Sequence, residues 1–179
     1  MAFTEVILVD ADDNPTGRLE KMQAHQQGLL HRAFSIFIFN SKGEMLLQQR
    51  AMNKYHSGGL WTNACCSHPL PDESTALAAQ RRLKEELGFE TLIHKIVDFV
   101  YKADMGNGLT EHEFDHVFAG EYDGPVMFNK EEVMDCCYKS VEEIRDNLVT
   151  HPGKYTPWFH IAFSKMESWY NKEYKSKLA

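Results

Sequence analysis

The alternation of apolar and polar positions along the chain predicts several β-strands. The clearest strand covers residues 33–39, where Phe, Ile, Phe, Ile and Phe follow in near succession. The turn sequence Asn-Ser-Lys-Gly at 40–43 separates it from a second strand over 44–50, so this pair predicts an antiparallel hairpin. Further strands are predicted over residues 4–9, 92–101, 112–121 and 133–138.

A helical pattern is clearest over residues 74–87. Asp72, Glu73 and Ser74 offer capping oxygens at its start, and Gly88 ends it, as the preferences of helix termini predict. Apolar residues recur on one stripe at helical spacing, which predicts a face packed on the core. They are Ala76, Ala79, Leu83 and Leu87. Shorter helical patterns cover residues 19–25, 141–148 and 158–170.

Together these elements predict an α+β fold, in which helices and strands form layers around one core. The chain has 179 residues and no linker-like tract, so we expect a single domain over 1–179, with a frayed tail from about residue 171. Hydrophobic residues make up 43% of the chain and charged residues 25%, which is ordinary for a globular protein and excludes intrinsic disorder of the whole chain.

The charge balance narrows the expected partners. Lys and Arg number 19 against 26 Asp and Glu, and the resulting net charge of −7 argues against a nucleic-acid surface. A few placed cations can still hold a small anion. The apolar runs are far shorter than the ~20 residues that span a bilayer, and residues 1–10 lack the pattern of a secretion signal. We therefore expect a cytoplasmic monomer or weak homodimer that binds neither nucleic acid nor a membrane.

Four cysteines form two adjacent pairs, Cys65 with Cys66 and Cys136 with Cys137. Adjacent cysteines rarely satisfy disulfide geometry, so we expect free thiols, and the spacing also lacks the C-x-x-C pattern of thiol redox proteins. Cys66 lies two residues before His68, and in an extended segment such residues point to the same side. The two residues are either part of one reactive site or a buried thiol beside a hydrogen-bonded histidine.

Acidic residues alternate at the start of the strand predicted over 112–121. Glu111, Glu113 and Asp115 would share one face of that strand. Three like charges on one face repel one another unless a cation or solvent compensates. The pattern therefore indicates either a divalent metal site or a solvated outer face with Phe114 pointing inward.

Further candidate ligands are scattered along the chain. His25 and His31 could bind a metal from a loop and the following strand, or could be ordinary histidines. Glu85 and Glu86 lie at a helix C-terminus, where the helix dipole disfavours acids and a divalent ion would offset the cost. Four cations could together bind a diphosphate, or could be solvated charges. They are Lys21, Arg50, Lys54 and Arg82.

The predicted helix and the segment before it resemble the Nudix box, G-x5-E-x7-R-E-U-x-E-E-x-G-U, in which U is a bulky apolar residue. Glu73, Arg81 and residues 83–89 match this box, whereas Ser67 stands at its first glycine and Arg82 at the glutamate after the arginine. In Nudix hydrolases the helix glutamates gather metal ions that drive the attack of water on a diphosphate. An arginine on this flank implies that an intact diphosphate is held rather than hydrolysed.

A more specific resemblance covers residues from about 5 to 162. Residues 61–69 are similar to the W-T-N-x-x-C-x-H-P signature of the type I isopentenyl diphosphate isomerase family, and residues 111–113 to its E-x-E strand motif. The segment with Lys21, His25 and His31 resembles the N-terminal metal segment of that family. The resemblance implies a Nudix-like α/β/α sandwich with a mixed sheet and N- and C-terminal elaborations.

The same resemblance implies an activity, the interconversion of isopentenyl diphosphate and dimethylallyl diphosphate by protonation and deprotonation through a tertiary carbocation, in isoprenoid biosynthesis. Cys66 and Glu113 are then the two proton-transfer groups, with Tyr101 beside Glu113 and Trp158 facing the cation. We expect Glu113 with Tyr101 to act as the acid and Cys66 as the base. The alternatives are a Nudix-type diphosphohydrolase and a non-catalytic regulatory module that binds a metal or a diphosphate.

Two metal ions are also implied by this resemblance. One Zn or Mn ion would be held by three imidazoles and two carboxylates, a donor set that suits these metals. The implied ligands are His25, His31, His68, Glu111 and Glu113. One Mg ion would lie at Glu86 and bridge the oxygens of the diphosphate. The cations implied to neutralise the diphosphate are Lys21, Arg50, Lys54 and Arg82.

Overall fold

The structure, a computed structural model, describes residues 4–177. The strands are β1 (Glu5–Val9), β2 (Pro15–Glu20), β3 (His31–Phe39), β4 (Met45–Arg50), β5 (Trp61–Asn63), β6 (Cys65–Ser67), β7 (Ile93–Gly106), β8 (Leu109–Glu121) and β9 (Val133–Lys139). The α-helices are α1 (Lys21–Gln27), α2 (Thr75–Leu87), α3 (Val141–Thr150) and α4 (Pro157–Trp169). Shorter helical turns cover Pro152–Lys154, Tyr170–Tyr174 and Lys175–Lys177. Within residues 4–177, no helix has both the length and the apolar character needed to cross a lipid bilayer.

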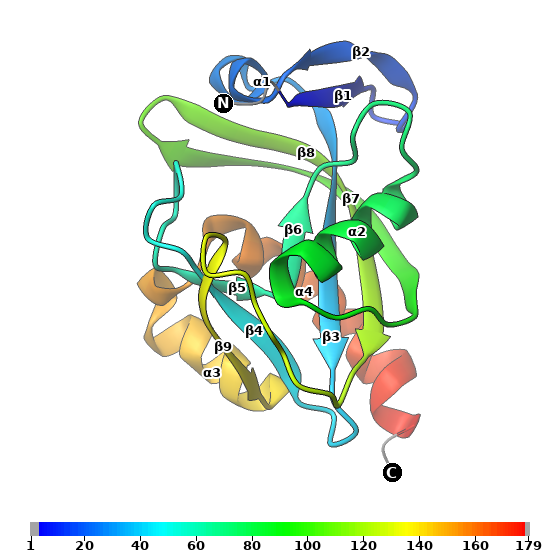
Figure 1. Cartoon of the computed structure of the whole chain (residues 1–179), viewed down its shortest axis with the longest axis vertical. Helices are drawn as coiled ribbons and strands as arrows, with labels where there is room; N and C mark the ends of the chain where they lie inside the picture. The colour runs from blue at the N-terminus through cyan, green and yellow to red at the C-terminus, as the bar shows by residue number, and fades with distance from the viewer. Residues whose placement is uncertain (1–3, 178–179) are drawn as a thin grey trace.

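The strands form one mixed sheet with β3 in its middle (Figure 1). β3 pairs antiparallel with β1, β4 and β6, and parallel with β8. β7 and β8 form a long antiparallel hairpin, and at its tip Gly106, Asn107 and Gly108 all have positive φ. Glycine and asparagine tolerate this backbone conformation better than other residues, which explains why the hairpin turns here.

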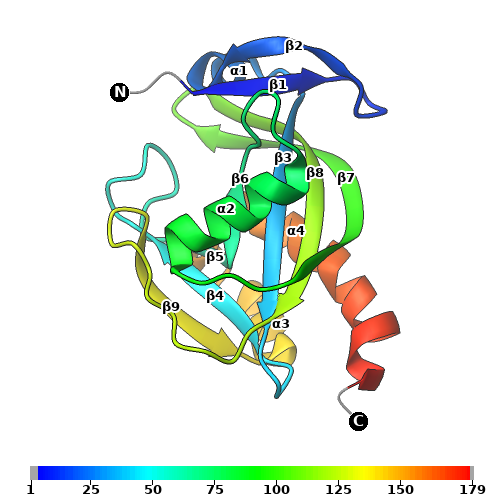
Figure 2. The ribbon, with the colours of Figure 1, turned by 45° about the vertical axis from the view of Figure 1, so that its right-hand side comes forward.

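Alternate side chains of β3 enter two different apolar clusters. Phe37 and Phe39 belong to the cluster that α3 and α4 cover, whereas Ile36 and Ile38 belong to the cluster under α2. All four side chains are fully buried, as expected for a near-continuous apolar strand covered on both faces. Figure 2 shows α2 on one side of the sheet and α4 on the other. The predicted α/β/α sandwich is therefore confirmed.

Helix α2 begins and ends where the capping residues predict. The Ser74 hydroxyl accepts a hydrogen bond from the backbone N–H of Leu77 at 3.3 Å, and Gly88 closes the helix with a φ of 76°. The expected core stripe is wrong at one position, because Ala76 is exposed and Ala78 is buried instead. The helix is turned so that Glu86 is also buried on its inner face. This rotation brings a carboxylate toward the sheet.

Three strands of the structure were not indicated by the hydrophobic pattern. β2 covers residues for which no strand is predicted, and it forms by antiparallel pairing with β1. β5 and β6 contain three residues each, too few for alternation to be visible, and they pair with β4 and β3. These two short strands carry the residues of the W-T-N-x-x-C segment and fix their positions beside β3 and β4.

The expectation of a frayed tail from about residue 171 is wrong for the residues that the structure describes. The chain continues beyond α4 as a π-helical turn over Tyr170–Tyr174 and then a 3-10 turn. Tyr174 is 3% exposed, and its ring lies 4.8 Å from that of Phe39. Burial of an aromatic ring offsets the ordering of a polar segment. Residues 178 and 179 lie outside the described part of the chain.

Candidate active site

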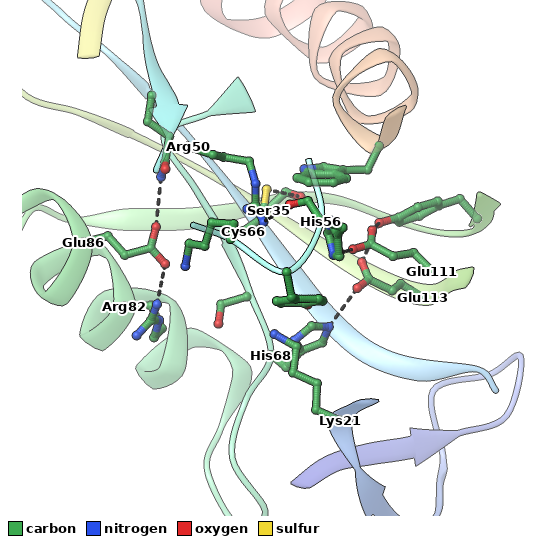
Figure 3. Close-up of a pocket in the computed structure, with 16 residues that line it drawn as sticks. Lys21, Ser35, Arg50, His56, Cys66, His68, Arg82, Glu86, Glu111 and Glu113 are labelled. Atoms are coloured by element: carbon green, nitrogen blue, oxygen red, sulfur yellow. Dashed lines mark hydrogen bonds and ion pairs between the residues drawn. The ribbon is translucent and has the colours of Figure 1, made fainter. Parts of the chain in front are cut away.

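A narrow polar pocket of about 70 Å³ opens between the middle of the sheet, α2, the start of α4 and the loop after β4 (Figure 3). Most of the residues singled out above line it. They are Lys21, Arg50, Lys54, Cys66, His68, Arg82, Glu86, Tyr101, Glu111, Glu113 and Trp158. His25 and His31 are fully buried. They lie beside the pocket, since one ring nitrogen of each is within 4.8 Å of the ligand atoms of His68 and Glu113. The fold thus brings the whole predicted set together.

Two of the histidines are oriented by backbone carbonyl groups. His25 Nδ1 lies 2.6 Å from the carbonyl oxygen of Lys21, and His31 Nδ1 lies 2.8 Å from that of Leu29. Each carbonyl can accept the Nδ1–H of its ring, and Nε2 of each ring is directed inward. Metal-binding histidines are characteristically held in this way by their second nitrogen.

The inward nitrogens meet a carboxylate on β8. His68 Nε2 lies 2.8 Å from Glu113 Oε1 and 3.2 Å from His31 Nε2. Parallel pairing of β3 with β8 produces this contact, because it sets His31 directly opposite Glu113. His25 Nε2 is buried and has no hydrogen-bond partner in the described structure. Several imidazoles and a carboxylate that converge in a buried space fit a divalent metal ion.

The acidic residues of β8 are buried, so the alternative of a solvated outer face is wrong. Glu111, Glu113 and Asp115 are 6%, 7% and 2% exposed. The Tyr101 hydroxyl lies 2.7 Å from Glu111 Oε2 and 2.6 Å from Glu113 Oε2, and it can donate its one proton to either. Burial, followed by the two glutamates, raises the pKa of Tyr101 well above its usual value. Phe114 points to the opposite face and packs with Ile7 and Val9.

Cys66 is held by side chains that sequence reasoning did not select. Its thiol donates to Asn63 Oδ1 at 3.0 Å and lies 3.5 Å from the Ser35 hydroxyl. Asn63 Nδ2 donates to the carbonyl groups of Ile36 and Cys65, both at 3.0 Å, so its oxygen must face the thiol. This network gives the asparagine of W-T-N-x-x-C a physical role, and a serine in an otherwise apolar core strand was a usable signal for Ser35.

The proton-transfer candidates differ in their electrostatic surroundings. Burial raises the pKa of the Cys66 thiol to about 12, and the nearby Asp115 adds to this effect. Burial by itself also raises the pKa of Glu113, but the hydrogen bonds from His31 and His68 outweigh it and hold that pKa well below its usual range. The surroundings of the two groups thus shift their pKa values in opposite directions, that of the thiol upward and that of the carboxyl group downward.

At the other end of the pocket, cations are paired with carboxylates. Arg82 donates to Glu86 at 2.6 Å, and Gln48 Nε2 donates to the other oxygen of Glu86 at 2.9 Å. Lys54 forms an ion pair with Glu132. Neither Gln48 nor Glu132 was selected from the sequence, because a glutamine on a strand and an isolated acid carry no spacing signal.

Aromatic rings form the remaining wall. Trp158, at the start of α4, is 3% exposed, and the Arg50 guanidinium lies 5.0 Å from its ring centre. Lys21 lies 5.0 Å above the ring of Tyr55. Burial lowers the pKa of Lys21, although Glu111 and Glu113 partly compensate. The cations of this wall are therefore poorly hydrated and ready to bind an anion.

The other acids and thiols singled out above lie outside the pocket lining. Glu73 accepts hydrogen bonds from Arg81 at 2.8 Å on the outer side of α2, and Glu85 is paired with Arg81 and Arg82. Cys136 and Cys137 lie on β9 as free thiols, and Cys65 is fully buried. Glu73 and Glu85 match the Nudix box, but here they form ion pairs with arginines of α2.

Comparison with known proteins agrees with this geometry. The NUDIX domain family model matches residues 29–159. A Burkholderia multivorans protein named isopentenyl-diphosphate Delta-isomerase is 50% identical over 160 residues, which covers 89% of this chain and 91% of that protein. A Serratia proteamaculans protein of the same name is 49% identical over 169 residues, with 92% and 94% covered. A crystal structure from Deinococcus radiodurans superimposes with a TM-score of 0.69 at 16% identity, covering 82% of this chain and 90% of that one, and supports the fold alone.

Proposed function

The chain belongs to the isopentenyl-diphosphate Delta-isomerase family and contains a Nudix domain, and from this premise we propose that it interconverts isopentenyl diphosphate and dimethylallyl diphosphate. One observation carries the proposal. Cys66 on β6 and the Glu113–Tyr101 pair on β8 and β7 line the same buried pocket. β6 and β8 pair with the two opposite edges of β3, so a thiol and a carboxylate approach one cavity from different directions.

The chemistry requires this kind of site. The terminal methylene carbon of the substrate must gain a proton, which leaves a tertiary carbocation, and the neighbouring methylene group must then lose a proton so that the double bond moves inward. An acid and a base must therefore reach two carbons of one small hydrocarbon. Water has to be excluded, because it would trap the cation as an alcohol.

We assign the two proton transfers to Cys66 and Glu113, with Tyr101 orienting the carboxylate. We keep the expected order, with Glu113 and Tyr101 as the acid and Cys66 as the base, and the 2.6 Å contact between the Tyr101 hydroxyl and Glu113 Oε2 supports a shared proton on that side. In the opposite direction of the reversible reaction the two groups exchange roles.

Trp158 is assigned to the developing carbocation. Its ring lines the pocket and already attracts the Arg50 guanidinium on its face. A cation over an indole ring in a dry site gains about 2 kcal/mol. That corresponds to a rate factor of roughly thirty, so the ring supports the acid and the base but cannot replace them.

The polar end of the pocket is assigned to the diphosphate. Lys21, Arg50, Lys54 and Arg82 line it. Glu86 lines the same pocket, and we assign it to one Mg ion that would be held together with the diphosphate, because magnesium uses few protein ligands. Anchoring the diphosphate here holds the hydrocarbon between the proton-transfer groups.

The first ion would be Zn or Mn, held by the three imidazoles and two carboxylates of the buried cluster: His25, His31, His68, Glu111 and Glu113. When bound, such an ion supplies positive charge that fixes the carboxylates and lowers the basicity of Glu113. The unpartnered Nε2 of His25 supports this assignment.

We further propose that the chain acts as one domain in the cytoplasm, as a monomer or weak homodimer. The net charge of −7 supports a partner list without nucleic acid. The partner that the pocket supports is a small diphosphate.

The decisive experiment follows the reaction in deuterated water. Protein reconstituted with Mn or Zn and with Mg is mixed with isopentenyl diphosphate, and products are identified by NMR. We expect dimethylallyl diphosphate that carries deuterium, with no release of phosphate. Phosphate release with an unmoved double bond would identify a diphosphohydrolase instead, and metal-dependent binding without any reaction would identify a regulatory module.

A further inference from the structure

His56 is a buried histidine in a loop whose other residues are mostly exposed or half-buried. The loop connects β4 to β5, and Met52 in the same loop is 70% exposed, whereas His56 is 6% exposed. Figure 3 shows the His56 ring beside Glu111, on the pocket wall opposite to Arg82 and Glu86. Neither the motifs nor the proposed mechanism assigns a role to this side chain.

Polar contacts and aromatic neighbours hold the His56 imidazole in one orientation. Its Nδ1 lies 3.3 Å from the Ser57 hydroxyl, and its Nε2 lies 3.3 Å from Glu111 Oε1 without a well-formed hydrogen bond. The ring meets Trp158 edge-on at 5.5 Å and Tyr55 edge-on at 4.3 Å. Aromatic packing of this kind holds the ring in one orientation, with Nε2 aimed at the acidic cluster.

The position of Nε2 relates His56 to the histidines of the metal cluster. The ligand atoms of His25, His56 and Glu111 all lie within 4.8 Å of one another, and His25 also belongs to the group formed with His31, His68 and Glu113. The two groups therefore share one histidine. In His25 and His56 alike, Nδ1 faces an oxygen atom and Nε2 is a buried nitrogen without a hydrogen-bond partner in the described structure.

We propose that His56 is a fourth histidine ligand of this metal centre, so that the ion is bound by four imidazoles and the two glutamates of β8. The proposal deepens the proposed function and rests on its metal site. A borderline divalent ion accepts a six-donor set of imidazole and carboxylate groups. An ion at this centre draws the two groups of donors together, since all of them surround the same buried space.

A consequence follows for the loop. Lys54, assigned to the diphosphate, lies two residues before His56. Binding of His56 to the ion would hold this segment against Trp158 and fix Lys54 at the mouth of the pocket. Metal loading and formation of the diphosphate site are then coupled through one short loop, and a protein without metal should bind a diphosphate more weakly.

The test counts imidazole ligands in the intact protein loaded with cobalt(II). Each coordinated ring gives an exchangeable N–H proton whose NMR resonance the ion shifts far outside the normal range. We expect one such resonance for each of His25, His31, His56 and His68 in the wild type, and one fewer in His56→Gln. The control is His94→Gln, an exposed histidine on β7, which should retain the wild-type number.

Metal affinity provides a second readout that does not depend on turnover. Competition with a chelator should show that His56→Gln binds cobalt or zinc at least tenfold more weakly than the wild type and His94→Gln. An unchanged resonance count together with unchanged affinity would overturn the proposal and leave His56 as a packing residue of the pocket wall. If His56→Gln fails to fold by circular dichroism, the wild-type count alone decides. A wild type that binds no ion would instead overturn the metal site of the proposed function.

Discussion

The two ends of the pocket differ in whether their buried polar and charged groups already have partners. At the histidine end, buried nitrogen atoms and carboxylates converge, and His25 Nε2 and Asp115 Oδ1 have no partner among residues 4–177. At the diphosphate end two of the four cations are already paired with a carboxylate, Arg82 with Glu86 and Lys54 with Glu132. Unsatisfied buried polar atoms are costly, so the first end is complementary to a cation. The second end keeps its cations ordered but exchangeable, and an anion can displace the carboxylates that hold them.

The largest effect is expected from a substitution that removes a proton-transfer group but leaves both ends of the pocket intact. Cys66→Ala should lower kcat by about a thousandfold or more, because a positioned proton-transfer group contributes about a hundredfold to ten-thousandfold. Binding of the diphosphate, measured by calorimetry, should change by less than threefold. Cys137→Ala, on β9, is the matched control and should have nearly wild-type activity. Near-normal turnover of Cys66→Ala would remove the thiol from the mechanism.

Removal of the metal tests the histidine end. A chelator should abolish turnover and lower the free energy of unfolding by about 3 kcal/mol when the ion had been present at a hundred times its dissociation constant. Thermal unfolding with and without the chelator measures this, and adding back Zn or Mn should restore both properties. Equal stability in the two conditions would mean that the buried cluster does not need a cation.

Arg82→Glu tests the diphosphate end by restoring the residue of the Nudix box. The variant removes a bidentate donor and adds a charge next to Glu86, so KM should rise about tenfold to a hundredfold, since each 1.4 kcal/mol is a factor of ten. The control is Arg81→Gln, whose side chain pairs with Glu73 outside the pocket lining. An unchanged KM for Arg82→Glu would show that Arg82 is only a surface charge.

The smallest effect concerns the ion pair between Arg81 and Glu73, which lies outside the pocket lining. The side-chain hydrogen bond from Arg81 lowers the pKa of Glu73. A carboxyl group with a lowered folded-state pKa contributes stability above its unfolded pKa, and this contribution disappears as the pH falls through the folded pKa. Glu73→Gln should therefore be about 0.5 kcal/mol less stable at pH 7, and the difference should vanish in acid. Denaturant titrations at several pH values measure it. A difference that persists in acid would mean that Glu73 acts by packing instead of by charge.

Local patterns were sufficient for the elements with their own periodicity or caps. Residues 33–39 are apolar almost without interruption, and they form the central strand β3. Ser74 and Gly88 define α2 to within a residue. The short strands β5 and β6 could not be predicted in this way, because a three-residue strand exists only through its pairing with β4 and β3.

What the sequence by itself determined is the fold class, the main strands and helix α2, and, through the motifs of a known family, the residues that bear the chemistry. Only the tertiary structure decided how these residues meet. The parallel register of β3 and β8 joins His31 to Glu113, and the fold of one loop brings His56 to Glu111. It also decided that Tyr174 is buried instead of frayed. Periodicity and caps report contacts between near neighbours in the chain, whereas strand register and loop packing join residues far apart in it, for which no local pattern exists.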